Sequence, residues 1–406
     1  YWVDMTDPYI TYKPKYMETV WWLLKEIYNK NLLYKGYTIQ PYSPKAGTGL
    51  SSHELNQPGT YQDITDTTVV AQFKAMAETL PDFLGEESNN IWFLAWTTTP
   101  WTLPLHRALV VNPHARYVLL DLDGNQAWVS EQSSQRWALS LGATVTSFSC
   151  LGSDLAGLQY SSPWVSAAVQ SDEAVLEDAG TGVLHAVPGL AELDTSLAKG
   201  HGWDVVQHLG VHGQVLRTPC ADQEGLKAGP AANVPVRGSY ESSPWFKEMP
   251  HEVLHPHCWR HHTPLLTRAS RQVFLHLTLD VRQRAQRMLG KLEFSPENAR
   301  ARLHAAMLDR PDWCLSRQRS WGVPLALFLD RSTGKPHACA STVMRRVADE
   351  VELEVDLPRA DIAILDWMLP GVSGLDLARE VTTADVLTLR LAAGGGQAIR
   401  FVAKPQ

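Results

Sequence analysis

The sequence predicts an α/β protein in which helical segments flank a β-rich middle. Apolar residues recur at steps of three and four over 14–35, which predicts a helix. Between about 90 and 240, short β-prone runs are separated by Asn, Gly and Pro, a pattern typical of a barrel or a sandwich. Helical patterns return at 281–289 and 296–308.

The elements follow in order. The first helix is expected to start at Pro14, whose fixed φ suits a first turn, and to stop at Gly36. Residues 37–80 are rich in Pro and Gly and are expected to form turns. The clearest strands are expected at 108–111, 117–120 and 182–187.

Composition favours a globular chain: 44% of the 406 residues are apolar, 19% are charged, and no apolar run is long enough to span a membrane. The start at Tyr1 has no signal-peptide pattern, and we expect it to be the interior of a longer protein. The five cysteines include no CxxC pair, which favours a reduced, cytoplasmic setting.

Charge is unevenly distributed. The net charge is −7, yet the segment from Arg260 to Arg319 holds 12 Lys and Arg against 5 Asp and Glu, a local balance of +7. Such a zone suits a phosphate backbone, although charge alone favours a solvated helix face. The candidate tRNA-binding residues in this zone are Arg282, Arg284, Arg287, Arg317 and Arg319.

Four sequence blocks carry a resemblance. They are Glu18–Trp22 with Leu32–Tyr37, the stretch WTTTPWTLP at 96–104, DAGTGVLHAVPG at 178–189, and Cys258–Pro264 with 310–324. In this order over roughly 325 residues, they resemble isoleucyl-tRNA synthetases of class I. The triple threonine is the isoleucine form rather than the valine or leucine form.

The resemblance implies a Rossmann-type catalytic core interrupted by a β-barrel-like editing insertion. Residues 1–45 would belong to the core, 46–89 to a connector, 90–235 to the editing domain, and 236–330 to the basic return to the core. The partners it implies are tRNA(Ile) and the aminoacyl groups valine and isoleucine, and we expect a monomer that does not bind membranes.

Editing answers a size problem. One missing methylene is worth only about 1–3 kcal/mol to a binding pocket, a limit for which isoleucine and valine are the known example. A second site must therefore admit valine, reject isoleucine and hydrolyse the ester. Positioned water is expected to attack, with no covalent enzyme intermediate and no cofactor.

The resemblance assigns roles residue by residue. Asp194 matches the aspartate that binds the substrate ammonium, and His185 matches the histidine that excludes isoleucine. Thr97, Thr98 and Thr99 match the threonines that line the site. Trp96, Trp101, His106 and Gly182 are the expected substrate-binding neighbours.

Each assignment has a structural alternative. Asp194 precedes Thr195 and Ser196 and suits a helix cap as well as an ammonium site. His185, taken alone, suits a buried strand, and the threonines suit an ordinary strand. The flanking glycines, tryptophans and prolines favour the functional interpretation.

The chain also departs from the family pattern. Position 106 is His where the family usually has Asn, and Leu190, Glu192 and Leu193 replace a polar and acidic run. Many relatives carry a CxxC near 43–46, where this chain has Ser43 and Ala46, and only Cys258 and His261 remain of the second half. Two ligands do not close a tetrahedral zinc site, so we expect no zinc.

ATP and Mg²⁺ serve amino-acid activation in the intact family, through HIGH-type and KMSKS-type motifs. Neither motif is present in this sequence, so ligase activity is not expected of this chain alone. The segment from His251 to His255 has HExxH spacing, but Pro250 and Pro256 argue against the helix that such a zinc motif needs.

The last 76 residues, 331–406, do not continue the synthetase pattern. Residues 361–376 resemble the phosphoacceptor strand and loop of a response-regulator receiver domain, with Asp366 as the phosphoacceptor and Lys404 as its lysine. The acidic pair Asp349–Glu350 lies too close in sequence for a complete receiver. A chain that joins parts of two families is explained by a fusion, by an assembly artefact or by an artificial sequence, and the residues do not decide among these.

Three hypotheses follow from the sequence. The chain is an isoleucyl-tRNA synthetase fragment whose editing site hydrolyses Val-tRNA(Ile), or a non-enzymatic tRNA-binding remnant, or a chimera that signals through Asp366.

Overall fold

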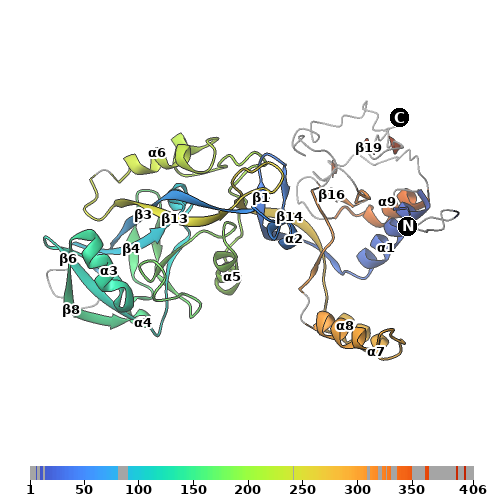
Figure 1. Ribbon diagram of the computed structural model, residues 1–406, viewed down its shortest axis with the longest axis horizontal. Coiled ribbons are helices and arrows are strands. Elements are labelled where there is room, and N and C mark those ends of the chain that lie inside the picture. The colour runs from blue at the N-terminus through green and yellow to red at the C-terminus, as the bar shows by residue number, and fades with distance from the viewer. Residues whose placement is uncertain are drawn as a thin grey trace. The chain divides into compact units, whose positions relative to one another are not determined.

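The computed structural model of the chain divides into two compact units, residues 37–270 and residues 1–36 with 271–406 (Figure 1). It describes residues 6, 10–11, 14–80, 90–240, 242–308, 311–318, 322–325, 327–330, 336–349, 362–364, 390–391 and 397–398. Asp366 and Lys404 lie outside these residues, as does Arg319. Two strands, β1 (Leu33–Ser43) and β14 (Leu266–Leu275), carry the chain from one unit to the other.

The unit of residues 37–270 is built on a mixed sheet of eight described strands, with the order β10-β9-β3-β4-β7-β6-β8 and β13 paired to β3. A smaller sheet has the order β11-β5-β12. The strands are β2 (Thr48–Gly49), β3 (Tyr61–Ala75), β4 (Ile91–Thr97), β5 (Ala108–Val111), β6 (Arg116–Leu122), β7 (Asn125–Ser130), β8 (Thr144–Leu151), β9 (Gln159–Ser161), β10 (Ser166–Ala168), β11 (Gln170–Ser171), β12 (Val183–Ala186) and β13 (Lys247–Pro256).

Short helices connect these strands. They are α2 (Ser52–Leu55), α3 (Glu131–Leu141), α4 (Gly152–Leu155), α5 (Glu192–His201) and α6 (Pro230–Gly238), with 3₁₀ turns η1 (Ala77–Thr79), η3 (Pro100–Leu105) and η4 (Ala221–Gln223). Helix α3 lies beside β6 and β8 (Figure 1). It packs on β6, β7 and β8 through Trp137 and Ala138. The predicted strand-rich character of 90–240 is confirmed, with strands at each of the three expected runs.

Strand alternation gives the sheet two apolar faces. Phe73, Phe93 and Leu119 belong to one cluster of buried residues, and Val70, Leu94 and Leu120 belong to another. Both faces of these strands are therefore covered, and a slip of one residue would place each side chain in the packing of the opposite face.

The prediction of turns over 37–80 was wrong for most of that segment. β3 spans 15 residues, and its part from Tyr61 to Val70 pairs with β13, with Val70 opposite Lys247 and Tyr61 opposite Pro256. The prolines and glycines lie before it, whereas every residue of 64–70 except Asp66 is β-branched, and such residues favour a strand. Residues 251–255 lie in β13, so the prediction that they form no helix is confirmed.

The other unit begins with α1 (Pro14–Asn29), which is shorter than predicted. The helix does not reach Gly36, because Asn31 adopts a left-handed conformation and Leu33 enters β1. Gly36 lies inside that strand, where a Cβ would come within 3.1 Å of the Phe274 ring. Tight packing, rather than a helix stop, explains this glycine.

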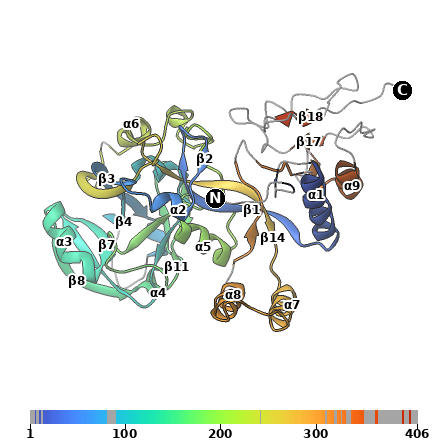
Figure 2. The same cartoon turned by 45° about the vertical axis from the view of Figure 1, so that its right-hand side comes forward.

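Helices α7 (Leu279–Leu289) and α8 (Asn298–Leu308) lie side by side, as both views of the fold show (Figures 1 and 2). Both were predicted. The remaining described elements of this unit are β15 (Trp313–Cys314), β16 (Phe328–Asp330), α9 (Ala340–Asp349), β17 (Ile362–Ile364), β18 (Arg390–Leu391) and β19 (Gln397–Ala398). No helix among the described residues is both long and apolar enough to cross a membrane.

Candidate functional site

The threonine stretch begins where β4 ends. Thr97 is the last residue of β4 and is buried, while Thr98 and Thr99 are exposed before the proline that starts η3. The Thr97 and Thr99 hydroxyls lie 3.3 Å apart, and the backbone N–H of Thr99 donates to Thr97 Oγ1 at 3.1 Å. The structure therefore gathers two of the three predicted threonines into one hydrogen-bonded turn.

A fourth threonine, which sequence reasoning missed, extends this turn. Thr102 lies in η3, and its hydroxyl donates to the carbonyl oxygen of Thr99 at 2.7 Å. Its Oγ1 also lies 3.0 Å from His185 Nε2. The spacing of three residues between Thr99 and Thr102, in a turn opened by Pro100, was the available signal.

His185 reaches this turn from β12, which pairs with β5 so that His185 lies opposite Leu109. Its other ring nitrogen, Nδ1, lies 2.7 Å from Nδ1 of His106. His106 Nε2 in turn lies 2.6 Å from the hydroxyl of Tyr160, which accepts the Leu109 backbone N–H at 2.9 Å. We call Thr97, Thr99, Thr102, His106, Tyr160 and His185 the threonine–histidine cluster.

Burial controls the charge of this cluster. Loss of solvation lowers the pKa of His185 to about 3, and the pKa of His106 is also well below its usual value, for the same reason and because His185 and Arg107 lie nearby. Both imidazoles are therefore neutral at pH 7. Phe73 packs beside them, with its ring centroid 4.8 Å from that of His106.

Asp194 lies in the first turn of α5 and is 7% exposed. Its Oδ2 accepts the backbone N–H of Val187 at 2.8 Å, two residues beyond His185. The helix cap residue is Ala191, so the alternative that Asp194 is an N-terminal cap is wrong. Burial raises the pKa of Asp194 to about 6, against the lowering effect of its backbone hydrogen bonds.

The residues that replace the family's polar run surround this helix start. Leu190 packs on an apolar cluster with Val187, whereas Leu193 is exposed and Glu192 opens α5. Leu190 thus contributes packing, and none of the three offers a hydrogen bond to Asp194 among those described.

The remaining predicted substrate-binding residues lie apart from the cluster. Trp96 alternates with Thr97 on β4. It packs on the opposite face of the sheet, against the apolar cluster that contains Val70 and Leu94. Trp101 is buried with Val187, and its carbonyl accepts from Gln223 at 2.6 Å. Gly182 has a positive φ, and a Cβ there would come within 2.4 Å of Ser130. Their observed roles are in packing and turn geometry.

The predicted tRNA-binding arginines belong to the other unit and have varied surroundings. Arg282 donates to the carbonyls of Leu277, Met307 and Leu308, and Arg317 donates to those of Cys314 and Ser316. Arg284 pairs with Asp280 on the exposed face of α7, where Arg287 is also exposed. Arg284 and Arg287 thus remain the accessible candidates.

The residues at the zinc position do not fit a closed metal site. Cys258 Sγ lies 3.5 Å from His261 Nδ1, but Cys258 is buried against Leu50 and Leu265. Within the described part of the chain, no three His, Cys, Asp or Glu side chains gather as metal ligands would. A tetrahedral site needs four.

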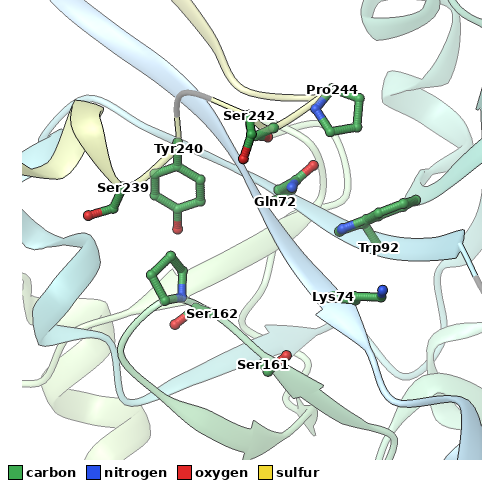
Figure 3. Close-up of a pocket in the computed structure, with 11 residues that line it drawn as sticks. Gln72, Lys74, Trp92, Ser161, Ser162, Ser239, Tyr240, Ser242 and Pro244 are labelled. Carbon is green, nitrogen blue, oxygen red and sulfur yellow. The ribbon is translucent and has the colours of Figure 1, made fainter.

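A separate hollow of about 310 Å³ lies beside Gln72, Lys74, Trp92 and Tyr240 (Figure 3). Gln72 Oε1 and the Tyr240 hydroxyl are buried without a hydrogen-bond partner among the described residues. Gln72 and Lys74 alternate with Phe73 along β3, so they point to the opposite face of the strand from the threonine–histidine cluster.

The sequence matches the family described as tRNA synthetases class I (I, L, M and V) over residues 1–368. It is 35% identical to the isoleucine–tRNA ligase of Bacteroides fragilis, with 81% of this chain and 34% of the relative covered. The corresponding enzyme of Cytophaga hutchinsonii is 35% identical, covering 95% and 40%, and that of Thermus thermophilus is 33% identical, covering 84% and 32%. The chain thus spans about a third of the length of the curated relatives it matches.

Two solved structures are also similar to part of the chain. The crystal structure of GlLeuRS-CP1 has a TM-score of 0.34 at 19% identity, covering 44% of this chain and 98% of that one. The P. knowlesi cytosolic leucyl-tRNA synthetase editing domain has a TM-score of 0.36 at 12% identity, covering 48% and 99%. TM-scores this low do not establish a common fold.

Proposed function

Because the chain belongs to the class I tRNA synthetases for isoleucine, leucine, methionine and valine, we propose that its unit of residues 37–270 hydrolyses valine wrongly esterified to tRNA(Ile). One observation carries the proposal. The buried carboxylate of Asp194 accepts the backbone N–H of Val187, two residues beyond His185, and the ring of His185 contacts the threonine turn. A buried anion next to a hydroxyl-lined turn suits an aminoacyl ester, which pairs an ammonium with a reactive carbonyl.

Asp194 binds the ammonium of the aminoacyl group in this proposal. The carboxylate is mostly ionised at pH 7, since its pKa is about 6, and a bound ammonium favours the ionised form further. Low exposure strengthens that ion pair relative to one in water.

His185 limits the size of the aminoacyl side chain. A neutral, buried ring held at both nitrogens cannot move aside easily, so it rejects isoleucine and still admits the smaller valine. Thr97, Thr98 and Thr99 hold the ester and the attacking water by hydrogen bonds. The step is direct attack of water on the carbonyl, which releases valine and the tRNA 3′ hydroxyl.

Amino-acid activation lies outside this proposal. The HIGH-type and KMSKS-type motifs through which the intact family uses ATP and Mg²⁺ are absent from the 406 residues. Editing itself requires neither, and we propose that the chain in isolation is a hydrolase, not a ligase.

The test is deacylation of Val-tRNA(Ile) compared with Ile-tRNA(Ile) by the full chain. We expect valine-selective hydrolysis that falls on the order of 100-fold in Asp194→Ala, because a charge-assisted contact to the ammonium is lost. Asp63→Ala, at an exposed position on β3, is the matched control and should leave the rate unchanged.

Hydrolysis at the uncatalysed rate by the unmodified chain would overturn the proposal. Retained tRNA binding in that case would favour a tRNA-binding protein without activity.

A further inference from the structure

A continuous line of hydrogen bonds runs through the threonine–histidine cluster from Tyr160 to Thr102. The links are Tyr160 Oη to His106 Nε2 at 2.6 Å, His106 Nδ1 to His185 Nδ1 at 2.7 Å, and His185 Nε2 to Thr102 Oγ1 at 3.0 Å. All four side chains are buried, so water does not replace any of these partners.

The two ends of the line fix the direction of every proton. Tyr160 Oη already accepts the Leu109 N–H, so its own proton goes to His106 Nε2. At the other end, the Thr99 carbonyl can only accept, so the Thr102 hydroxyl donates to it. Thr102 Oγ1 must then accept from His185 Nε2–H.

The proton between the two imidazoles follows from these ends. His106 accepts at Nε2, so its single proton is on Nδ1 and points at His185 Nδ1. The reverse direction would leave the buried Tyr160 proton without an acceptor. It would also take the Thr102 hydroxyl proton away from the Thr99 carbonyl, which would keep only the Thr102 backbone N–H. A buried donor without a partner is costly, so the first direction is favoured.

We propose that His106 is a positioning residue that holds His185 in the Nε2–H tautomer and fixes its ring toward Thr102. His185 then acts as a rigid wall and a hydrogen-bond donor to the threonine turn, not as a base. Tyr160 supports this role by fixing His106. The effect on substrate selection rests on the proposed editing function, whereas the tautomer itself does not.

The ring geometry explains why a histidine suits position 106. Its two nitrogens reach two partners at once, Tyr160 and His185, and the adjacent Phe73 ring restricts its rotation. Low pKa values keep both imidazoles neutral, and one proton on each ring is what the line of hydrogen bonds requires.

The first measurement is the tautomer of each ring, by two-bond ¹H–¹⁵N correlation NMR of the full chain labelled with ¹⁵N-histidine, at pH 7. We expect Nε2–H for His185 and Nδ1–H for His106. His106→Asn keeps a donor toward His185 and should preserve its tautomer. His106→Leu removes that donor and should release His185 into a mixture of both tautomers.

The second measurement is the ratio of deacylation rates, kcat/KM for Val-tRNA(Ile) over Ile-tRNA(Ile). We expect His106→Leu to lower this ratio about tenfold, the scale of one lost hydrogen bond, and His106→Asn to restore most of it. His114→Leu is the matched control, because His114 is exposed and pairs with Glu173 at the surface.

Nδ1–H for His185 in the unmodified chain would overturn the proposal, as would an unchanged tautomer and rate ratio in His106→Leu. If His106→Leu does not fold, Tyr160→Phe takes its place and should release the tautomer of His106. Absence of deacylation by the unmodified chain would refute the editing function alone, since the NMR result decides the tautomer independently.

Discussion

The threonine–histidine cluster and the helices α7 and α8 differ in how their polar side chains are buried and paired. The longest-range hydrogen bond of the cluster joins residues 83 positions apart in sequence, and most of its hydroxyls and imidazoles are buried. In α7 and α8, Arg284 and Arg300 pair with acidic residues four and three positions away on exposed surface. The first arrangement requires the whole unit to be folded, whereas the second forms wherever the helices form.

This difference predicts where substitutions will change the free energy of unfolding most. A buried polar group that loses its partner costs about 1–3 kcal/mol, whereas an exposed ion pair is worth about 0.2–1 kcal/mol. The cluster is therefore sensitive to substitution of the residues that pack on it, whereas the exposed ion pairs of Arg284 and Arg300 are not.

The largest expected effect comes from the packing beneath the cluster. Phe73 is fully buried, and its ring lies against His106 and Tyr160. Phe73→Ala should lower the free energy of unfolding by about 3–5 kcal/mol, because it removes a large ring and leaves a cavity. Leu303→Ala on α8, where the side chain is 42% exposed, should change it by less than about 0.5 kcal/mol. Urea denaturation of both variants measures these two changes. Equal losses of unfolding free energy would contradict the predicted difference between the cluster and the helices.

The next effect is a pH dependence of stability, to which the buried imidazoles of the cluster should contribute. The folded pKa of His185 is about 3, while the unfolded value is near 6.5, so the unfolded chain binds more protons between these limits. His185 therefore contributes stability that is complete above pH 6.5 and is lost as the pH falls toward 3. His106 acts in the same direction.

Titration of Asp194 changes the stability with pH in the opposite direction. Its folded pKa is raised from 3.8 to about 6, so the folded chain binds more protons in that window, and stability falls as the pH rises from 3.8 to 6. Asp194→Asn should remove this component and make the histidine slope steeper. Unfolding free energies from pH 4 to 8 measure both slopes. A slope in Asp194→Asn no steeper than in the unmodified chain would contradict the assignment.

The parts of the site that sequence predicted are those encoded in short, contiguous motifs. Thr97 and His185 lie within such blocks, and Asp194 follows one closely, so each could be proposed from the sequence. Tyr160 was missed because it meets His106 from a three-residue strand 54 positions away, and no local pattern marks that contact. Likewise, β3 was missed because its partner, β13, lies more than 170 residues further along the chain.

The helix error has a similar origin. The apolar run through Leu32 and Leu33 continues the helical pattern, but the left-handed Asn31 ends the helix and the following residues pair in a sheet. Periodicity predicts which residues are apolar on one face, and tertiary pairing decides which element they enter.

The smallest expected effect separates two arginines of α7. Arg282 donates to three backbone carbonyls near the ends of the helices, and Arg282→Ala should cost about 1–3 kcal/mol because those acceptors lose a charged donor. Arg284 pairs only with the exposed Asp280 among its described contacts, so Arg284→Ala should cost less than about 1 kcal/mol.

Arg284 should instead affect tRNA binding, if the proposed interaction with the phosphate backbone holds. Replacing one phosphate-contacting arginine lowers the slope of log affinity against log salt by about one. Arg284→Gln should therefore weaken binding most at low salt, whereas Arg282→Gln should alter stability and leave the slope unchanged. Filter binding of unacylated tRNA(Ile) between 50 and 200 mM salt, roughly the range over which counterion release is pronounced, measures both slopes. An unchanged slope in Arg284→Gln would place the tRNA contact elsewhere and reduce the exposed arginines of α7 to a solvated helix face.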